Sequence, residues 1–215
     1  MLDQLANGRY GGFFATIKET FTLKNKHNLS KTIYATSYKI KKFENFKFVE
    51  NLEETFDSES IVYSPETYLV ENVKAFLEIC DNLNKKAYLD TPNFALEKDI
   101  KLLKSIIETT TIAIIANNYY ALSFDTEIVI GGGLNAYNLI TAEEYDKPIL
   151  SAESSISTHI NFPYMTLRHC PFKSHLKATC ANCPYSNNYT YRMDNGKILK
   201  LKRKKLSSCT FYLTD

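Results

Sequence analysis

The sequence predicts an α/β protein: a partial or compact (β/α) TIM-barrel-like domain followed by a β-rich lobe that carries four cysteines. From Thr32 onward, short β-rich segments alternate with longer segments of helical period. Such alternation indicates parallel strands joined by helical crossovers. The β-rich segments are apolar at nearly every position, as is typical of parallel strands buried on both faces. After Ser154 the alternation stops, and a tail rich in cysteine and lysine follows.

The chain therefore divides into three parts. Residues 1–31 form a lead-in segment, in which only a short helix near residues 15–22 is expected. Residues 32–160 are expected to form the barrel-like domain, and residues 161–215 the four-cysteine, β-rich lobe. A chain of 215 residues can bury one sizeable core, which fits one domain with an appendage.

Six strands are expected in the barrel-like domain, fewer than the eight of a closed barrel. No G-x-G-x-x-G follows the first strand, which disfavours a nucleotide-binding sheet, and Gly131–Gly133 indicates a tight bend. The expected strands lie at residues 32–40, 60–65, 86–92, 110–118, 126–133 and 147–154.

Two amphipathic helices are expected between these strands, at residues 66–86 and 95–110. In each segment the apolar residues recur at i, i+3, i+4 and i+7, the spacing of one helix face. Cys80 lies on such a face and is expected to be a core residue. The apolar positions are Leu69, Val70, Val73, Phe76, Leu77 and Cys80 in the first helix, and Leu96, Ile100, Leu103, Ile106 and Ile107 in the second.

Polar residues follow most of the predicted strands at their carboxyl ends. In a (β/α) barrel these ends form one rim, where catalytic residues lie. For any single residue, capping of the following helix is the alternative role. The polar pairs are Ser64 and Glu66, Asp90 and Asn93, Asn117 and Asn118, Asn135 and Asn138, and Ser151 and Glu153.

Four of the five cysteines lie in the last quarter of the chain. Cys180 and Cys183 form a C-x-x-C pair, whose two thiolates can bind one metal from a single turn. Cys170 precedes the pair, and a predicted hairpin would return Cys209 to the same place. Four thiolates are a complete set for tetrahedral Zn²⁺ or for a four-iron four-sulfur cluster. The spacing alone leaves the choice of metal open.

Two alternatives to a metal centre stay open for these cysteines: unconnected reduced thiols, or a redox dithiol at the C-x-x-C pair. A redox motif normally opens a helix after a strand, whereas Pro184 follows the pair here. His169 and His175 flank Cys170 and could replace a cysteine in a zinc site.

The tail also carries a predicted hairpin and a basic run. Asn195-Gly196, flanked by alternating apolar residues, is a strong hairpin signal. Residues 200–205 are mostly basic, which fits either contact with nucleic acid or a solvated strand edge. Arg168 is a candidate for holding an acidic or phosphorylated substrate group, the alternative being an ion pair with Glu153.

Composition and charge exclude little. The net charge of +2 predicts no strong global field. No apolar run reaches the roughly 20 residues of a membrane span, so no membrane insertion is expected. Since no secretory signal is recognisable, we expect a cytoplasmic protein whose clustered cysteines bind metal rather than form disulfides.

The order of motifs in the second half resembles the C-terminal part of the collagenase-like peptidase U32 family. The segments are "LNAYNLITAEEYDKPILSAESS", then "PYMTLRHCPFK", then C-x-x-C, a D-x-G hairpin and a last cysteine. In that family a (β/α) barrel leads into a P-hydrophobic-M-x-x-R-x-C-P pattern. The pattern is matched here by Pro163, Met165, Arg168, Cys170 and Pro171.

The resemblance implies an activity, a cofactor and partners. Members of the family are classed as peptidases, and several are oxygen-independent hydroxylation factors that act on RNA or on quinone precursors. Those members carry a four-iron four-sulfur cluster, which the resemblance assigns here to Cys170, Cys180, Cys183 and Cys209. It also implies an RNA or small aromatic substrate and a redox partner. Family proteins are longer, so the chain resembles a shortened member or a C-terminal portion.

Three functional hypotheses follow. In the first, a cluster near the rim relays electrons to a substrate held by Asn135, Ser151, Glu153 and Arg168. In the second, the cysteines hold structural Zn²⁺ in a non-catalytic accessory or binding module. In the third, the chain is a collagenase-like peptidase, although it has no H-E-x-x-H and no G-x-S-x-G. A homo-oligomer or a hetero-oligomer is compatible with all three.

Overall fold

The structure is a computed structural model that describes residues 45–136, 145, 148–149, 163–186 and 189–214. The chain divides into two units, and the described residues all belong to the second, Phe43–Asp215. The expected helix near 15–22, the expected strand at 32–40 and most of the expected strand at 147–154 lie outside the described residues.

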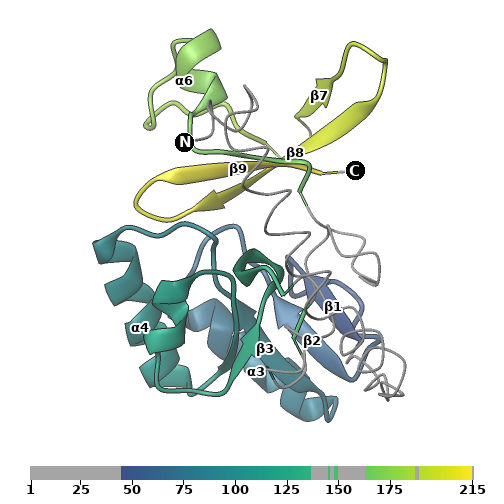
Figure 1. Ribbon diagram of the computed structural model, residues 1–215, viewed down its shortest axis with the longest axis vertical. Coiled ribbons are helices and arrows are strands. Elements are labelled where there is room, and N and C mark those ends of the chain that lie inside the picture. Colours follow the sequence, from purple (N-terminus) through teal and green to yellow (C-terminus); the bar gives the residue numbers. More distant parts are fainter. Residues whose placement is uncertain (1–44, 137–144, 146–147, 150–162, 187–188, 215) are drawn as a thin grey trace, which may run out of the picture. The chain divides into compact units, whose positions relative to one another are not determined.

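A five-stranded parallel sheet forms the first layer of the described fold (Figure 1). The strands lie side by side in the order in which they occur in the chain, each parallel to the next. Within the part of the chain that is described, they do not close into a barrel. The strands are β1 (Phe46–Val49), β2 (Ser60–Tyr63), β3 (Lys86–Asp90), β4 (Ala113–Ala116) and β5 (Ile128–Ile130). The predictions at 60–65, 86–92, 110–118 and 126–133 are confirmed.

Strand β1 was not predicted from the sequence. Its four residues, Phe-Lys-Phe-Val, are buried only at the two ends, Phe46 and Val49. Among the described strands, β1 pairs only with β2. The two middle residues of β1 are half-buried, so this strand lacks the continuous buried apolar run that marks β2 and β4.

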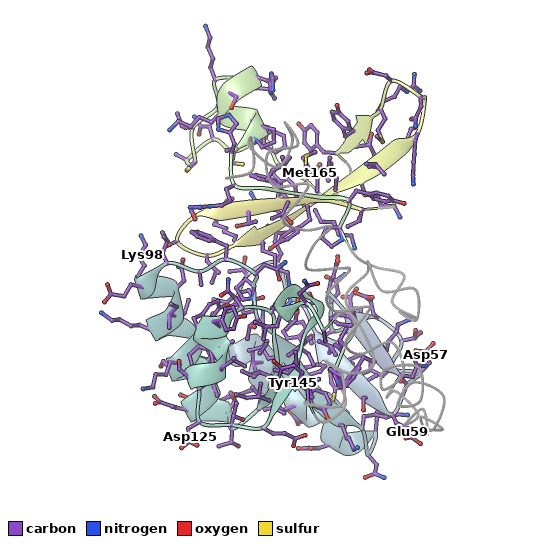
Figure 2. All side chains as sticks on the ribbon, in the orientation of Figure 1. Asp57, Glu59, Lys98, Asp125, Tyr145 and Met165 are labelled. Carbon is purple, nitrogen blue, oxygen red and sulfur yellow. The ribbon has the colours of Figure 1, made fainter. Side chains whose placement is uncertain are left out.

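Helices α3 (Val70–Asn82) and α4 (Glu97–Thr110) confirm the two predicted helices. Their apolar side chains pack with those of the sheet in one core, which includes Phe76 and Cys80 from α3 and Leu103 and Ile106 from α4. Charged side chains such as Lys98 point away from this core (Figure 2). The opposite face of the sheet carries a second cluster of buried residues: Phe46, Val62, Tyr88, Ile115, Val129 and Ile149.

A four-stranded antiparallel sheet follows, in the order β6-β9-β8-β7. The predicted hairpin is confirmed, with Gly196 at its turn in a left-handed conformation (φ 83°). Met165 on β6 is half exposed (Figure 2). The core of this sheet is small and comprises Phe172, Leu199, Leu201, Phe211 and Leu213. The elements are β6 (Met165–Leu167), α6 (Pro171–His175), β7 (Thr190–Arg192), β8 (Ile198–Lys205) and β9 (Cys209–Thr214).

The short 3-10 helices η1 (Tyr119–Ser123) and η2 (Gly132–Leu134) follow β4 and β5. No helix among the described residues is long and apolar enough to cross a membrane.

Candidate metal centre and strand-end pocket

A pocket of about 650 Å³ lies at the carboxyl ends of the parallel strands. Strand β8 of the antiparallel sheet contributes a second wall, Lys200 to Lys204. This is the edge at which parallel α/β sheets carry their ligand sites. The structure brings five of the polar residues predicted at strand ends to this pocket: Ser64, Glu66, Asp90, Asn93 and Asn117.

Asp90, the last residue of β3, is the centre of a polar network in this pocket. Only 9% of the residue is exposed. Its Oδ1 accepts a hydrogen bond from Asn117 Nδ2 at 2.7 Å. Its Oδ2 accepts hydrogen bonds from Ser64 Oγ at 2.6 Å and from Lys204 Nζ at 3.0 Å. The carboxylate is thus held by an amide, a hydroxyl and an ammonium group, which a buried charge requires.

Lys204 reaches this network from β8. Its ammonium group also donates to Ser64 Oγ at 2.6 Å and approaches Tyr68 OH at 3.4 Å. The Tyr68 hydroxyl donates to the backbone oxygen of Asp90 at 2.7 Å. Burial, and next the negative charge of Asp90, hold the pKa of Tyr68 well above its ordinary value. The phenol therefore stays a neutral hydrogen-bond donor.

Two glycines allow the chain after β5 to approach Asn117. A β-carbon added at Gly131 would lie 2.2 Å from Asn117 Oδ1, and one added at Gly133 would lie 2.3 Å from the Asn117 backbone oxygen. Only glycine fits such an approach without displacing a neighbour. The bend predicted at Gly131–Gly133 therefore packs against Asn117, whose amide donates a hydrogen bond to Asp90.

Consecutive basic residues of β8 pair with carboxylates at the strand ends. Lys202 pairs with Glu50, Arg203 with Glu66, and Lys204 with Asp90. The Lys205 amide also donates to the Glu66 carbonyl oxygen at 2.6 Å. Half of the six basic residues between 197 and 205 thus form internal ion pairs, which weakens the nucleic-acid interpretation of this run.

Asp99, on α4, contacts the turn between β8 and β9 of the antiparallel sheet. Its carboxylate accepts hydrogen bonds from the Ser207 amide and hydroxyl, both at 2.8 Å. It also accepts a hydrogen bond from the Leu96 amide at 3.0 Å and so caps the first turn of α4. Burial opposes ionisation, but these hydrogen bonds outweigh it and lower the pKa of Asp99.

The four candidate metal ligands are free thiols on one lobe. Cys170 immediately precedes α6, and Cys209 is the first residue of β9. Cys180 is exposed and Cys183 is half-buried in the loop between α6 and β7. Cys80 is buried in the other core, where burial raises its thiol pKa to about 11.

Cys209 interacts electrostatically with each of the other three candidate ligands. Burial raises the pKa of the Cys209 thiol, the charge of Arg203 lowers it, and Cys170, Cys183 and Cys180 raise it further. Cys170 and Cys209 pack against the same apolar cluster, and Cys183 lies beside Arg203. As they stand, no three His, Cys, Asp or Glu side chains of the described segments are arranged to hold a metal ion.

Arg203 links the cysteines to the pocket. Its Nη1 donates to Cys183 Sγ at 3.5 Å, and its Nε donates to Glu66 Oε1 at 2.8 Å. Its guanidinium carbon lies 4.0 Å from the centre of the Tyr185 ring. Arg203, Glu66 and Tyr185 all line the pocket. A single side chain thus contacts both a candidate ligand and the pocket wall.

The described residues among those predicted to hold substrate do not line this pocket. Asn135 is exposed after η2 in a left-handed conformation (φ 60°) and does not line the pocket. Arg168 lies 3.5 Å above the centre of the Phe94 ring and also lies outside the pocket lining. Ser151 and Glu153 lie outside the described residues. His169 contacts Ser174.

Sequence analysis missed Lys204 and Arg203 as pocket residues. Asp90 and Lys204 are separated by 114 positions, and no local pattern indicates such a pair. The one available signal was complementarity between acidic residues 50–66 and the basic run at 197–205.

The fold and these contacts define an α/β protein with a parallel sheet and a cysteine-bearing antiparallel sheet. Comparisons with known proteins identify no relative: no family model matches the chain, and neither a curated protein nor a solved structure matches it.

Proposed function

We propose that the chain is a metal-centre protein of the collagenase-like peptidase U32 type, with a ligand pocket beside the metal. The ligands are Cys170, Cys180, Cys183 and Cys209, and the favoured centre is a four-iron four-sulfur cluster. The observations that support the proposal are that Cys170 and Cys209 pack against the same apolar cluster and that Arg203 Nη1 lies 3.5 Å from Cys183 Sγ. The sequential order of the five parallel strands supports a partial (β/α) barrel as the scaffold.

The donor set fits a soft or borderline metal. Thiolate ligands suit iron–sulfur clusters and Zn²⁺. Two of the ligands, Cys170 and Cys209, pack against the apolar core of the lobe, which would shield a bound group from water on one side. Arg203 supplies positive charge beside the thiolates. A reducing compartment such as the cytoplasm would keep all four thiols available.

The pocket would bind a small molecule. Its volume of about 650 Å³ lies within the range of about 300–1,000 Å³ that is typical of ligand sites. Asp90, Ser64 and Asn117 present a fixed polar floor, while Tyr185 and Tyr212 offer aromatic surface. Oxygen-independent hydroxylation takes its oxygen atom from a donor such as water and, with water, removes two electrons and two protons from the ligand. A cluster bound at the four cysteines would accept those electrons one at a time, and a redox partner would be needed to carry them away.

A non-catalytic module with structural Zn²⁺ is the second candidate. It is favoured by the small core of the antiparallel sheet, which contains only five buried apolar residues among those described. Small cores often need a metal for stability. Peptidase activity finds no comparable support, because no nucleophile, base and orienting group are aligned among the contacts described above.

Metal analysis of the full chain, purified without oxygen, tests the proposal. We expect about four irons per chain and a broad absorption band near ~400 nm if the centre is a cluster. One Zn²⁺ per chain and no colour would favour the structural module. The variant Cys180→Ser should lose the metal, whereas Cys80→Ala should retain it. Protein without bound metal that cannot be reconstituted with iron, sulfide or zinc would refute both forms.

A further inference from the structure

Arg203, on β8, contacts both a carboxylate of the pocket and the sulfur of a cysteine. Its side chain is 14% exposed, although it lies on a strand between two lysines. The guanidinium group is divided between two partners. Nε and Nη2 bind Oε1 of Glu66, while Nη1 donates to Cys183 Sγ at 3.5 Å.

The geometry of the guanidinium group explains why an arginine is needed here. Its N–H groups are fixed in one plane, so one edge can bind a carboxylate while the remaining nitrogen is directed at a sulfur. The Tyr185 ring lies against the guanidinium group, with 4.0 Å between its centre and the guanidinium carbon, and restricts its tilt. A lysine has one compact ammonium group and could not keep both contacts in the same orientation.

Lys202 and Lys204 provide the comparison within the same strand. Both pair with carboxylates at the strand ends, Glu50 and Asp90, as Arg203 pairs with Glu66. Among the described residues, the hydrogen bonds of these two lysine side chains go to Glu50, Ser64, Tyr68 and Asp90, and none goes to a cysteine. Both lysines pair with a carboxylate without a sulfur contact, so the sulfur contact of Arg203 is additional to its carboxylate pairing.

We propose that Arg203 is a positioning residue of the metal centre. It orients Cys183 and offsets the negative charge of the bound thiolates, and Glu66 in turn orients Arg203. This inference rests on the proposed metal binding at the four cysteines. Groups that hydrogen-bond to metal ligands typically change metal affinity by about 10- to 100-fold when they are removed. An N–H···S bond also favours the more negative, reduced state of a cluster.

Zn²⁺ affinity, measured by competition with a chromophoric chelator on the full chain, tests the inference. We expect Arg203→Gln to bind Zn²⁺ about 10- to 100-fold more weakly than the unsubstituted chain. Lys202→Gln is the matched control, because it also removes a docking charge but no sulfur contact, and it should change affinity less than about threefold. Arg203→Lys keeps the charge but not the planar fork, so it should recover only part of the affinity lost in Arg203→Gln.

Two further measurements separate positioning from folding. Glu66→Gln leaves Arg203 in place but removes its orienting carboxylate, and it should weaken Zn²⁺ binding by several-fold in a folded chain. In cluster-loaded protein, Arg203→Gln should lower the midpoint reduction potential, which a purely structural role would not do. Equal Zn²⁺ affinities for Arg203→Gln and Lys202→Gln would overturn the inference while leaving metal binding intact. Absence of metal binding by the unsubstituted chain would instead overturn the proposed function.

Discussion

Asp90 and Lys204 form an ion pair in which both side chains are almost withdrawn from water, with 13% and 14% of their surfaces exposed. Such a pair need not stabilise a fold more than an apolar pair would. Loss of one partner, however, leaves the other charge without compensation at a position largely withdrawn from water. The hydroxyl of Ser64 and the amide of Asn117 would not replace a missing ammonium group.

Lys204→Gln should lower the free energy of unfolding by roughly 2–5 kcal/mol, because Asp90 then remains charged without its counter-ion. Urea unfolding measures the change. Lys200→Gln is the control: Lys200 is exposed on the same strand, and its loss should cost less than about 0.5 kcal/mol. Similar unfolding curves for the two variants would show that the pair contributes little.

Asp99 leads to a prediction about how the stability of the fold depends on pH. Its pKa is lowered in the folded protein because hydrogen bonds from Leu96 and Ser207 outweigh the effect of burial. The unfolded carboxyl titrates near ~3.9. The stabilisation from Asp99 is therefore complete above that pH and is lost as the pH falls through the lower folded pKa.

Asp99→Asn should accordingly be less stable than the unsubstituted chain at pH ~6, by about 0.5–1.5 kcal/mol, because the amide loses the charge and one of the two acceptor oxygens. The difference should shrink as the pH falls below ~4. Thermal or urea unfolding across this range provides the measurement, with Asp125→Asn at an exposed position as control. A difference that stays constant with pH would exclude the carboxylate as its source.

At the scale of elements, the close approach of the chain after β5 to Asn117 determines the bend there, rather than local sequence propensity. Gly131→Ala would place a methyl group 2.2 Å from Asn117 Oδ1 and 2.9 Å from the Ala116 backbone oxygen. We expect a loss of about 1–3 kcal/mol in the free energy of unfolding. Asn117 would also move away from Asp90.

Gly196→Ala is the matched control for this variant. Gly196 has a left-handed conformation, but no atom lies within 4 Å of an added β-carbon. It should therefore cost only about 1 kcal/mol, from backbone strain alone. If Gly131→Ala unfolds no more easily than Gly196→Ala, the close approach to Asn117 does not constrain the fold.

The predictability of the elements followed their burial. The strands β2 and β4 are continuous apolar runs, and α3 and α4 each carry an apolar face, so local pattern identified all four. Strand β1 is half-buried and has only four residues, which leaves too little pattern to recognise. The hairpin was predictable because Asn195-Gly196 favours the required turn.

The candidate site was predictable only where residue type carried the chemistry. The cysteines could be recognised by their spacing. The polar residues at the strand ends could be recognised by their position after apolar runs. The pairing of β8 with Glu50, Glu66 and Asp90 depends on tertiary docking over more than 100 positions. No local pattern encodes which of two oppositely charged segments will meet, or in which register.

At the scale of the whole molecule, we expect a bound metal to stabilise the antiparallel sheet more than the parallel sheet. The parallel sheet has a large core, whereas the antiparallel sheet has five buried residues and would gain a cross-link between its loops and β9. Chelation, or Cys183→Ser, should therefore speed amide hydrogen exchange in residues 163–186 and 189–214. Exchange in α3, α4 and the strands between them should change little.

Cys80→Ala provides the opposite control, since Cys80 belongs to the core of the parallel sheet. It should speed exchange in α3 and leave the cysteine lobe protected. Uniform loss of protection in both sheets after chelation would mean that the two unfold as one cooperative unit.

The pairing of β8 with the strand ends also has a consequence for synthesis of the chain. Glu50, Glu66 and Asp90 are translated well before Lys202, Arg203 and Lys204. The three basic residues, which pair with these acids, follow each of them by more than 100 positions. Until then the acidic strand ends of the parallel sheet lack these partners. The proposed ligand pocket is therefore complete only after residues 202–204 have been translated.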